Sequence, residues 1–313
     1  MTYKDKFYFL LTLIILLALV YTGSFVFSPE RRNERSASYI WLDSKSAATA
    51  DRIVIDTPWY AIELVKKNNR WFILHDGYEF PARQTRIEDF LEIFSVRSLW
   101  PVRSSNASSH SRFGLETETA SRLTVYNRNS RLMDLLIGDD DFSGQINIRR
   151  FAHNEVRSGG GRISSYIINT VNSWHNLRLI PETENRSTGI NDVQRLSVFN
   201  EGETMIFSRL NREWVISGAD VSNPDQNSIE NYIYGVINAE GDSFADPLFA
   251  DDLIFNHGRI VLEMGNGDII IIRFSERDES GRLFAHVNSG GYVYSIPAWT
   301  AARLFTDSSS FQR

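Results

Sequence analysis

The chain has 313 residues, of which 42% are hydrophobic and 23% charged, and it contains no cysteine. This is the composition of a folded protein long enough for two cores, and it excludes disulfides and thiolate metal sites. The net charge of −6 comes without a long basic run, which argues against a nucleic-acid partner.

Residues 7–27 contain no Asp, Glu, Lys or Arg, and basic residues stand on both sides of them. A helix of this length spans the roughly 30 Å hydrocarbon core of a lipid bilayer. The alternative is a cleaved signal peptide, whose shorter apolar part ends in small residues, whereas Phe25-Val26-Phe27 is bulky. We therefore predict a transmembrane helix at 7–27 and a cytoplasmic tail at 1–6. The short tail and the acidic body favour an inner (cytoplasmic) membrane protein whose C-terminal body is extracytoplasmic.

Residues 28–50 are small and polar, with one apolar interruption at 39–42. This composition predicts a stalk. The interruption is either part of that stalk or a short strand that caps the first domain.

Alternating apolar segments at 52–55, 61–65 and 71–74 are separated by turn residues. They predict a three-stranded antiparallel meander. A helix follows, with Thr85 as its N-cap and Glu88 completing a capping box. Its apolar face is Ile87, Phe90, Leu91 and Phe94.

Strand patterns return at 122–126 and 132–137. Two more strands and a Trp-bearing helix capped by Asn169 complete a first α+β repeat at 51–180. The polar segment 181–194 predicts a linker between domains.

The same order of features recurs in residues 195–305, which we interpret as a second repeat; residues 306–313 form a tail. The second helix has Asn227 and Glu230 as its capping box, and Ser295 caps the last helix. The matched features are Arg52-Ile53 with Arg195-Leu196, Trp71 with Trp214, Ile87 with Ile229, Arg122-Leu123 with Arg259-Ile260, Gly144 with Gly281, Tyr166 with Tyr292 and Trp174 with Trp299.

The predicted fold class is therefore α+β. An N-terminal transmembrane helix precedes two tandem duplicated modules of mainly antiparallel sheet, each covered by helices. Paired tryptophans in the two modules predict core positions rather than ligand contacts.

Two segments invite a ligand interpretation. The carboxylates within 138–141 suggest a Ca²⁺ site, but the alternating Asp-x-Asp-x-Asp-Gly order of calcium ligands is missing. The matching segment 275–279 is also acidic, so we interpret both segments as hairpin tips. The glycines at 158–162 suggest a phosphate loop, but residues 162–166 have a strand pattern, so a glycine hairpin turn is preferred.

No motif of a zinc hydrolase, serine hydrolase or dinucleotide enzyme is present, although a carboxylate pair assembled by the fold needs no local motif. We predict no catalysis, no cofactor and no metal. Candidate partner-binding residues are the polar side chains of the insertion at 151–165 and two tryptophans without a counterpart in the other repeat. These are His153, Arg157, Arg162, Trp59 and Trp100.

An ordered set of short motifs resembles a bacterial family, the membrane-anchored proteins called domain of unknown function 4340. The motifs are Leu64-Val65-Lys66-Lys67, Trp71, Phe80-Pro81-Ala82, Phe113-Gly114-Leu115, and Leu132 followed by Leu135-Leu136-Ile137-Gly138. The family continues Asp-x-Pro after the third motif, where this chain has Glu116-Thr117-Glu118. The resemblance covers residues 50–180. It implies a single-pass, extracytoplasmic partner of gliding-type ABC transporters, and it carries no catalytic residue.

The expected function is an accessory or scaffold protein of a membrane complex that includes ABC transporter membrane subunits. A tethered receptor for a glycan or small ligand and an envelope hydrolase are the alternatives. A large pocket favours the receptor, converging buried carboxylates favour the hydrolase, and an exposed apolar patch favours the scaffold.

Overall fold

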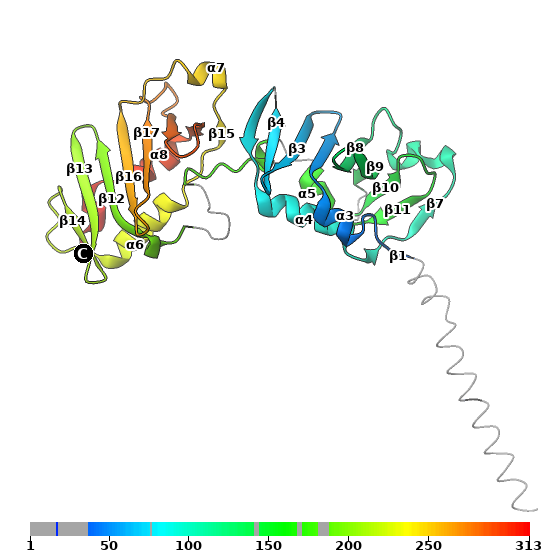
Figure 1. Ribbon diagram of the computed structural model, residues 1–313, viewed down its shortest axis with the longest axis horizontal. Helices are drawn as coiled ribbons and strands as arrows, with labels where there is room; N and C mark the ends of the chain where they lie inside the picture. Colours follow the sequence, from blue (N-terminus) through cyan, green and yellow to red (C-terminus); the bar gives the residue numbers. More distant parts are fainter. Residues whose placement is uncertain (1–16, 18–36, 76, 141–143, 168–170, 181–187) are drawn as a thin grey trace, which may run out of the picture. The chain divides into compact units, whose positions relative to one another are not determined.

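The computed structural model describes residue 17 and residues 37–75, 77–140, 144–167, 171–180 and 188–313 (Figure 1). The chain is α+β with mostly antiparallel sheets, as predicted, and it divides into two compact units between Trp174 and His175. The predicted anchor at 7–27 lies outside the described residues apart from Leu17. Within the described ranges, no helix has the length and apolar character needed to cross a bilayer.

The first unit is built on a nine-stranded antiparallel sheet, in the order β5-β4-β3-β2-β8-β9-β10-β11-β7. The predicted meander is confirmed by strands β2 to β4, and the hairpin between β3 and β4 turns at Asn68 and Asn69, whose φ angles are 48° and 62°. Both angles suit asparagine in a type I′ turn. The strands are β2 Arg52–Asp56, β3 Ala61–Lys67, β4 Arg70–His75, β5 Tyr78–Pro81, β7 Val102–Ser104, β8 Ser121–Asn127, β9 Ser130–Asp140, β10 Ile146–Arg150 and β11 Val156–Gly159.

Helix α4 (Gln84–Ser95) buries the predicted stripe against one face of this sheet. Ile87, Phe90 and Phe94 are fully buried, and each contributes roughly 1.5–3 kcal/mol by leaving water. The predicted capping box is wrong, because the N-cap is Arg83 and makes no side-chain cap bond.

Residues 37–50 of the predicted stalk belong to the fold of the first unit, and residues 28–36 lie outside the described residues. Strand β1 (Ser38–Tyr39) pairs with β6 (Ser98–Leu99), and helix α3 spans Ser44–Thr49. Trp41 and Leu42 are buried, and the N–H groups of both donate to Phe94 O at 3.0 Å. Of the two interpretations of residues 39–42, packing against the first domain is confirmed, although β1 includes only Tyr39 of these residues.

The other face of the sheet carries a small apolar cluster over β9 to β11. Leu115, Leu136 and Val156 are its buried members. Leu115 comes from a covering segment with two short 3-10 helices, η1 (Ala107–Ser109) and η2 (Ser111–Phe113).

The end of the first unit differs from the prediction. Residues 162–166 are not a strand, since η3 (Gly161–Ile163) runs into helix α5 (Ser164–Ile167), followed by η4 (Val171–Trp174). The predicted cap Asn169 lies outside the described residues. Trp174 is fully buried against Phe90, with ring centroids 5.3 Å apart, so its predicted core position is confirmed.

The second unit has an eight-stranded sheet in the order β14-β13-β12-β16-β17-β18-β19-β15. Strand for strand this is the order of the first sheet without β5, with β2 answering to β12 and β8 to β16. The strands are β12 Val193–Asn200, β13 Glu203–Leu210, β14 Glu213–Ser217, β15 Ser243–Phe244, β16 Gly258–Met264, β17 Ile269–Phe274, β18 Leu283–Val287 and β19 Val293–Ile296.

Helix α6 (Gln226–Ile237) covers this sheet and is capped by Asp225, which accepts from Ser228 N, rather than by the predicted Asn227. Helix α8 (Ala298–Leu304) follows Pro297, and the predicted cap Ser295 lies inside β19. Two further short elements are α7 (Pro247–Ala250) and η5 (Ile190–Asp192).

The predicted limits of the second module are corrected at both ends. Leu179 and Ile180 are buried in the second core, so the boundary lies after Trp174 and not at 181; residues 181–187 of the predicted linker lie outside the described residues. The predicted tail at 306–313 contains η6 (Ser308–Phe311), and Phe311 is buried in the same core.

Each unit joins its first sheet hairpins to its long helix through one glutamine. The N–H of Trp71 donates to Gln84 Oε1 at 2.8 Å, and Gln84 Nε2 donates to Trp71 O at 3.0 Å. Gln226 makes the same two bonds with Trp214, both at 2.8 Å. The side-chain amide thus supplies an acceptor to the N–H of a sheet tryptophan and ties the start of the helix to the sheet.

Substituting Gln84 or Gln226 with alanine is expected to destabilise its own unit by about 1–3 kcal/mol, because the backbone N–H of Trp71 or Trp214 loses its acceptor. Urea unfolding of the full-length chain, followed by hydrogen exchange of each unit, measures the loss. Thr85→Ala is the matched control, since this exposed side chain makes no cap bond. A loss for Thr85→Ala as large as that for Gln84→Ala would contradict the assignment.

Candidate functional site

Two of the five predicted partner-binding residues are inside the fold. Trp100 is 1% exposed, packs edge-to-face against Trp41 at 5.4 Å and donates its indole N–H to Ser98 Oγ. Arg157 is 8% exposed, and its guanidinium lies 4.1 Å from the Tyr39 ring and donates to Trp100 O at 2.8 Å. The prediction for these two residues is therefore corrected: Trp100 and Arg157 are structural residues that hold the β1 segment against the sheet.

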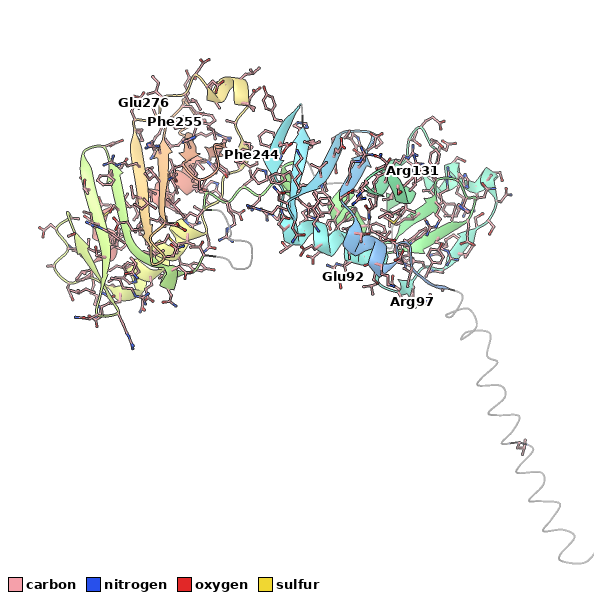
Figure 2. The ribbon with its side chains drawn as sticks, viewed as in Figure 1. Glu92, Arg97, Arg131, Phe244, Phe255 and Glu276 are labelled. Carbon is pink, nitrogen blue, oxygen red and sulfur yellow. The ribbon has the colours of Figure 1, made fainter. Side chains whose placement is uncertain are left out.

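The other three candidates are exposed but are not gathered into one site. His153 lies in the turn between β10 and β11, and Trp59, 74% exposed, lies in the turn between β2 and β3. Strands β8 and β9 separate these hairpins, a lateral distance of roughly 14 Å. Arg162 lines a shallow hollow of about 300 Å³ beside α4, together with Glu92, which Figure 2 labels.

The glycine run at 158–162 is a close-packing feature rather than a hairpin turn. A Cβ on Gly160, which has φ 57°, would lie 2.4 Å from the Trp100 ring, and one on Gly159 would lie 2.7 Å from Leu99 O. The glycines therefore let the chain pass over a buried indole. The three-residue helix that follows is too short to form an anion site.

The side chains of the first acidic segment, Asp139 to Asp141, lie outside the described part of the structure. Among the described residues, no group of three His, Asp or Glu side chains with ligand geometry occurs. In the matching loop of the second unit, Asp278 accepts from Ser280 N and Arg282 N, and the Ser280 hydroxyl bond is the main cause of its lowered pKa. This carboxylate organises a turn.

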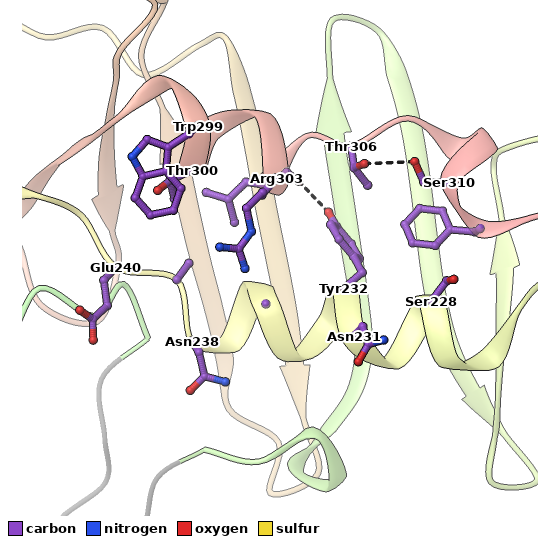
Figure 3. A pocket seen from close by; sticks show the side chains of 14 residues that line it. Ser228, Asn231, Tyr232, Asn238, Glu240, Trp299, Thr300, Arg303, Thr306 and Ser310 are labelled. Atoms are coloured by element: carbon purple, nitrogen blue, oxygen red, sulfur yellow. Dashed lines mark hydrogen bonds between the residues drawn. The ribbon is translucent and has the colours of Figure 1, made fainter.

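A groove of about 550 Å³ lies between α6 and α8 of the second unit (Figure 3). We call it the α6–α8 groove. Its volume is within the range of small-molecule sites. The wall from α6 consists of Ser228, Asn231, Tyr232, Gly235 and Asn238, and the opposite wall includes Trp299, Thr300, Arg303, Thr306 and Ser310.

The groove exists because small residues replace large ones on α6. Counted from Gln84 and Gln226, Ser228 occupies the position of Arg86, and Gly235 that of Ile93. In the first unit Arg86 lies 4.5 Å above the Tyr166 ring and donates to Ser165 O at 2.8 Å. The same place is thereby closed in the first unit by a cation stacked on an aromatic ring.

The floor of the groove is rigid. The Tyr232 hydroxyl donates to Leu304 O at 2.6 Å, and its ring packs on Phe207 and Phe311. Burial raises the pKa of Tyr232 far above its ordinary value, so the phenol stays neutral and acts as a strut between α6 and α8.

The rim offers groups for recognition. Trp299 is 64% exposed, which makes its predicted core position wrong. Arg303 extends from α8 towards α6 in Figure 3, and its Nη2 is 3.5 Å from where a Cβ of Gly235 would lie. Within the described ranges, neither Arg303 nor Asn231 makes a hydrogen bond or ion pair.

The groove was not predicted from the sequence, because the matching of Trp174 with Trp299 suggested equal burial. The sequence feature that could have revealed the groove is a size difference on two otherwise similar helices: Ser228 stands where the first helix has Arg86, and Gly235 where it has Ile93. Comparison of the chain with protein-family models, with curated proteins and with solved structures gives no match.

Proposed function

We propose that the chain is a single-pass, membrane-anchored scaffold protein whose extracytoplasmic body binds the membrane subunits of an ABC-type transporter and performs no catalysis. Residues 7–27 provide the anchor in this proposal, and the two units are duplicated copies of one module. The common strand order of the two sheets and the paired glutamines support the duplication.

The observation that carries the scaffold proposal is an exposed apolar ridge in the second unit. It consists of Leu248 (72% exposed), Phe249 (48%) and Ile254 (72%), in and directly after α7. Single exposed apolar residues are ordinary, but large ones grouped in one short segment mark protein interaction sites. Phe249 also packs on Phe284 at 5.2 Å, which fixes the ridge on the sheet.

Leu248→Ser with Ile254→Ser is expected to reduce recovery of transporter subunits at least tenfold, because the loss of two buried apolar anchors at an interface costs more than about 1.4 kcal/mol. The measurement is affinity purification of the tagged full-length chain from its own membranes, with quantitative mass spectrometry of co-purified proteins.

Leu210→Ser is the control, since Leu210 is 61% exposed on β13, outside the ridge. Equal recovery from the ridge variant and the control would remove the ridge from the proposal. Recovery of no transporter subunit with the unsubstituted chain would contradict the scaffold function itself.

A further inference from the structure

The α6–α8 groove presents a stacking surface and a cation to the same space. The indole ring of Trp299 is 64% exposed at the groove. Arg303 also lines the groove and has no carboxylate partner among the described residues. An indole face attracts the polarised C–H groups of a saturated ring, and a guanidinium binds a carboxylate through two parallel hydrogen bonds. The pair therefore suits a ligand that has both a ring and an acid group.

The remaining lining is rich in hydrogen-bonding side chains. Asn231 has no partner among the described residues, and Ser228 and Thr306 add hydroxyl groups at either wall. Thr300 is 5% exposed, and its Oγ1 has no hydrogen-bond partner in the described structure.

Peptide ligands fit this site poorly. Both walls are helices, whose backbone groups are already paired, so no sheet edge is offered for strand addition. A docked helix needs an apolar stripe, whereas the accessible α6 positions are Ser228, Asn231 and Asn238. Glu240 lines the same groove, and its carboxylate repels a doubly charged group such as a phosphate monoester more strongly than the single carboxylate of one sugar ring.

We propose that the α6–α8 groove binds an acidic saccharide with one carboxylate per sugar ring. The ring stacks on Trp299, the carboxylate pairs with Arg303, and the hydroxyl groups bond to Asn231, Ser228 and Glu240. The first unit lacks this activity because Arg86 and Ile93 occupy the equivalent space. The site is independent of transporter association through the apolar ridge.

The test is calorimetric titration of the full-length chain in lipid nanodiscs with trigalacturonate, using neutral trigalactose and triglutamate as comparison ligands. Trigalacturonate is expected to bind at least tenfold more tightly than either, as one charge-assisted pair contributes about 1.4 kcal/mol or more. Absence of binding at about 10 mM trigalacturonate, or equal binding of trigalactose or triglutamate, would overturn the proposal.

Variants locate the site. Trp299→Ala and Arg303→Gln are each expected to weaken trigalacturonate binding at least tenfold, while Trp59→Ala and Arg162→Gln, exposed residues of the same types in the first unit, leave it unchanged. Gly235→Ile restores the first unit's side chain and is expected to abolish binding with α6 intact, because isoleucine is a better helix former than glycine. Unaltered binding by Gly235→Ile, with normal thermal unfolding, would place the sugar elsewhere and defeat the assignment.

Discussion

Replacing Trp100 with alanine is expected to destabilise the first unit by about 3–5 kcal/mol. The indole is 1% exposed, contacts Trp41 edge-to-face and lies directly against Gly160. The backbone around Gly160 is fixed in a left-handed conformation, so the site collapses little and the cavity remains. Hydrogen exchange of the full-length chain in urea, resolved by peptide, measures the first unit separately from the second.

Trp59→Ala is the matched control, and its expected effect is within about 0.5 kcal/mol because the side chain is 74% exposed. Protection of the second unit is expected to stay unchanged, since its core is a separate cluster. A loss below about 1 kcal/mol for Trp100→Ala, together with reduced partner capture, would instead support the interface role suggested by the sequence.

The contrast between Trp59 and Trp100 shows that a sequence pattern alone does not determine which tryptophan is buried. Trp59 and Trp100 both lack a counterpart in the other repeat, so pattern alone treats them alike. Their burial is decided by non-local packing: the pairing of β1 with β6 brings residues 37–42 over Trp100, whereas Trp59 is 74% exposed among the described residues. Periodicity within one element contains no information about that pairing.

Local features were predictable from the sequence. The alternation in β2 to β4, the Asn68-Asn69 turn and the stripe on α4 follow from side-chain period and turn chemistry, and all three are confirmed. The residues that fix the start of each long helix were not predictable from the sequence. Thr85 matches a capping-box pattern that the structure does not use, whereas no local pattern marks Gln84 as the residue that makes the contact. Gln84 acts through Trp71, which is thirteen residues away in the chain.

The groove illustrates the limit of matching repeats. Trp174 and Trp299 follow the last sheet strand in each unit, yet the first is fully buried and the second is 64% exposed. In the first unit the chain after β11 makes only short turns of helix, and Trp174 enters the core beside Phe90. In the second unit Trp299 lies on the regular helix α8 and is 64% exposed beside the groove, where α6 has Ser228 and Gly235 in place of Arg86 and Ile93.

Arg149→Met is expected to destabilise the first unit by about 2–4 kcal/mol, although methionine fills much of the same volume. Arg149 is 6% exposed and donates to Leu115 O at 3.1 Å, Phe151 O at 2.8 Å and His153 O at 3.3 Å. Burial lowers the pKa of Arg149, but arginine remains protonated at neutral pH, so the loss is expected to be equal at about pH 6 and pH 8. Urea unfolding with peptide-resolved hydrogen exchange at both pH values measures it.

Arg162→Met is the control for removing an arginine from an exposed position, with an expected change within about 0.5 kcal/mol. Arg149→Lys separates charge from geometry, because one ammonium group keeps the charge but has no planar fork to reach three carbonyl groups. We expect its loss to lie between zero and that of Arg149→Met. Full stability of Arg149→Lys would show that charge alone holds the covering segment, and full stability of Arg149→Met would show that the carbonyl groups find water instead.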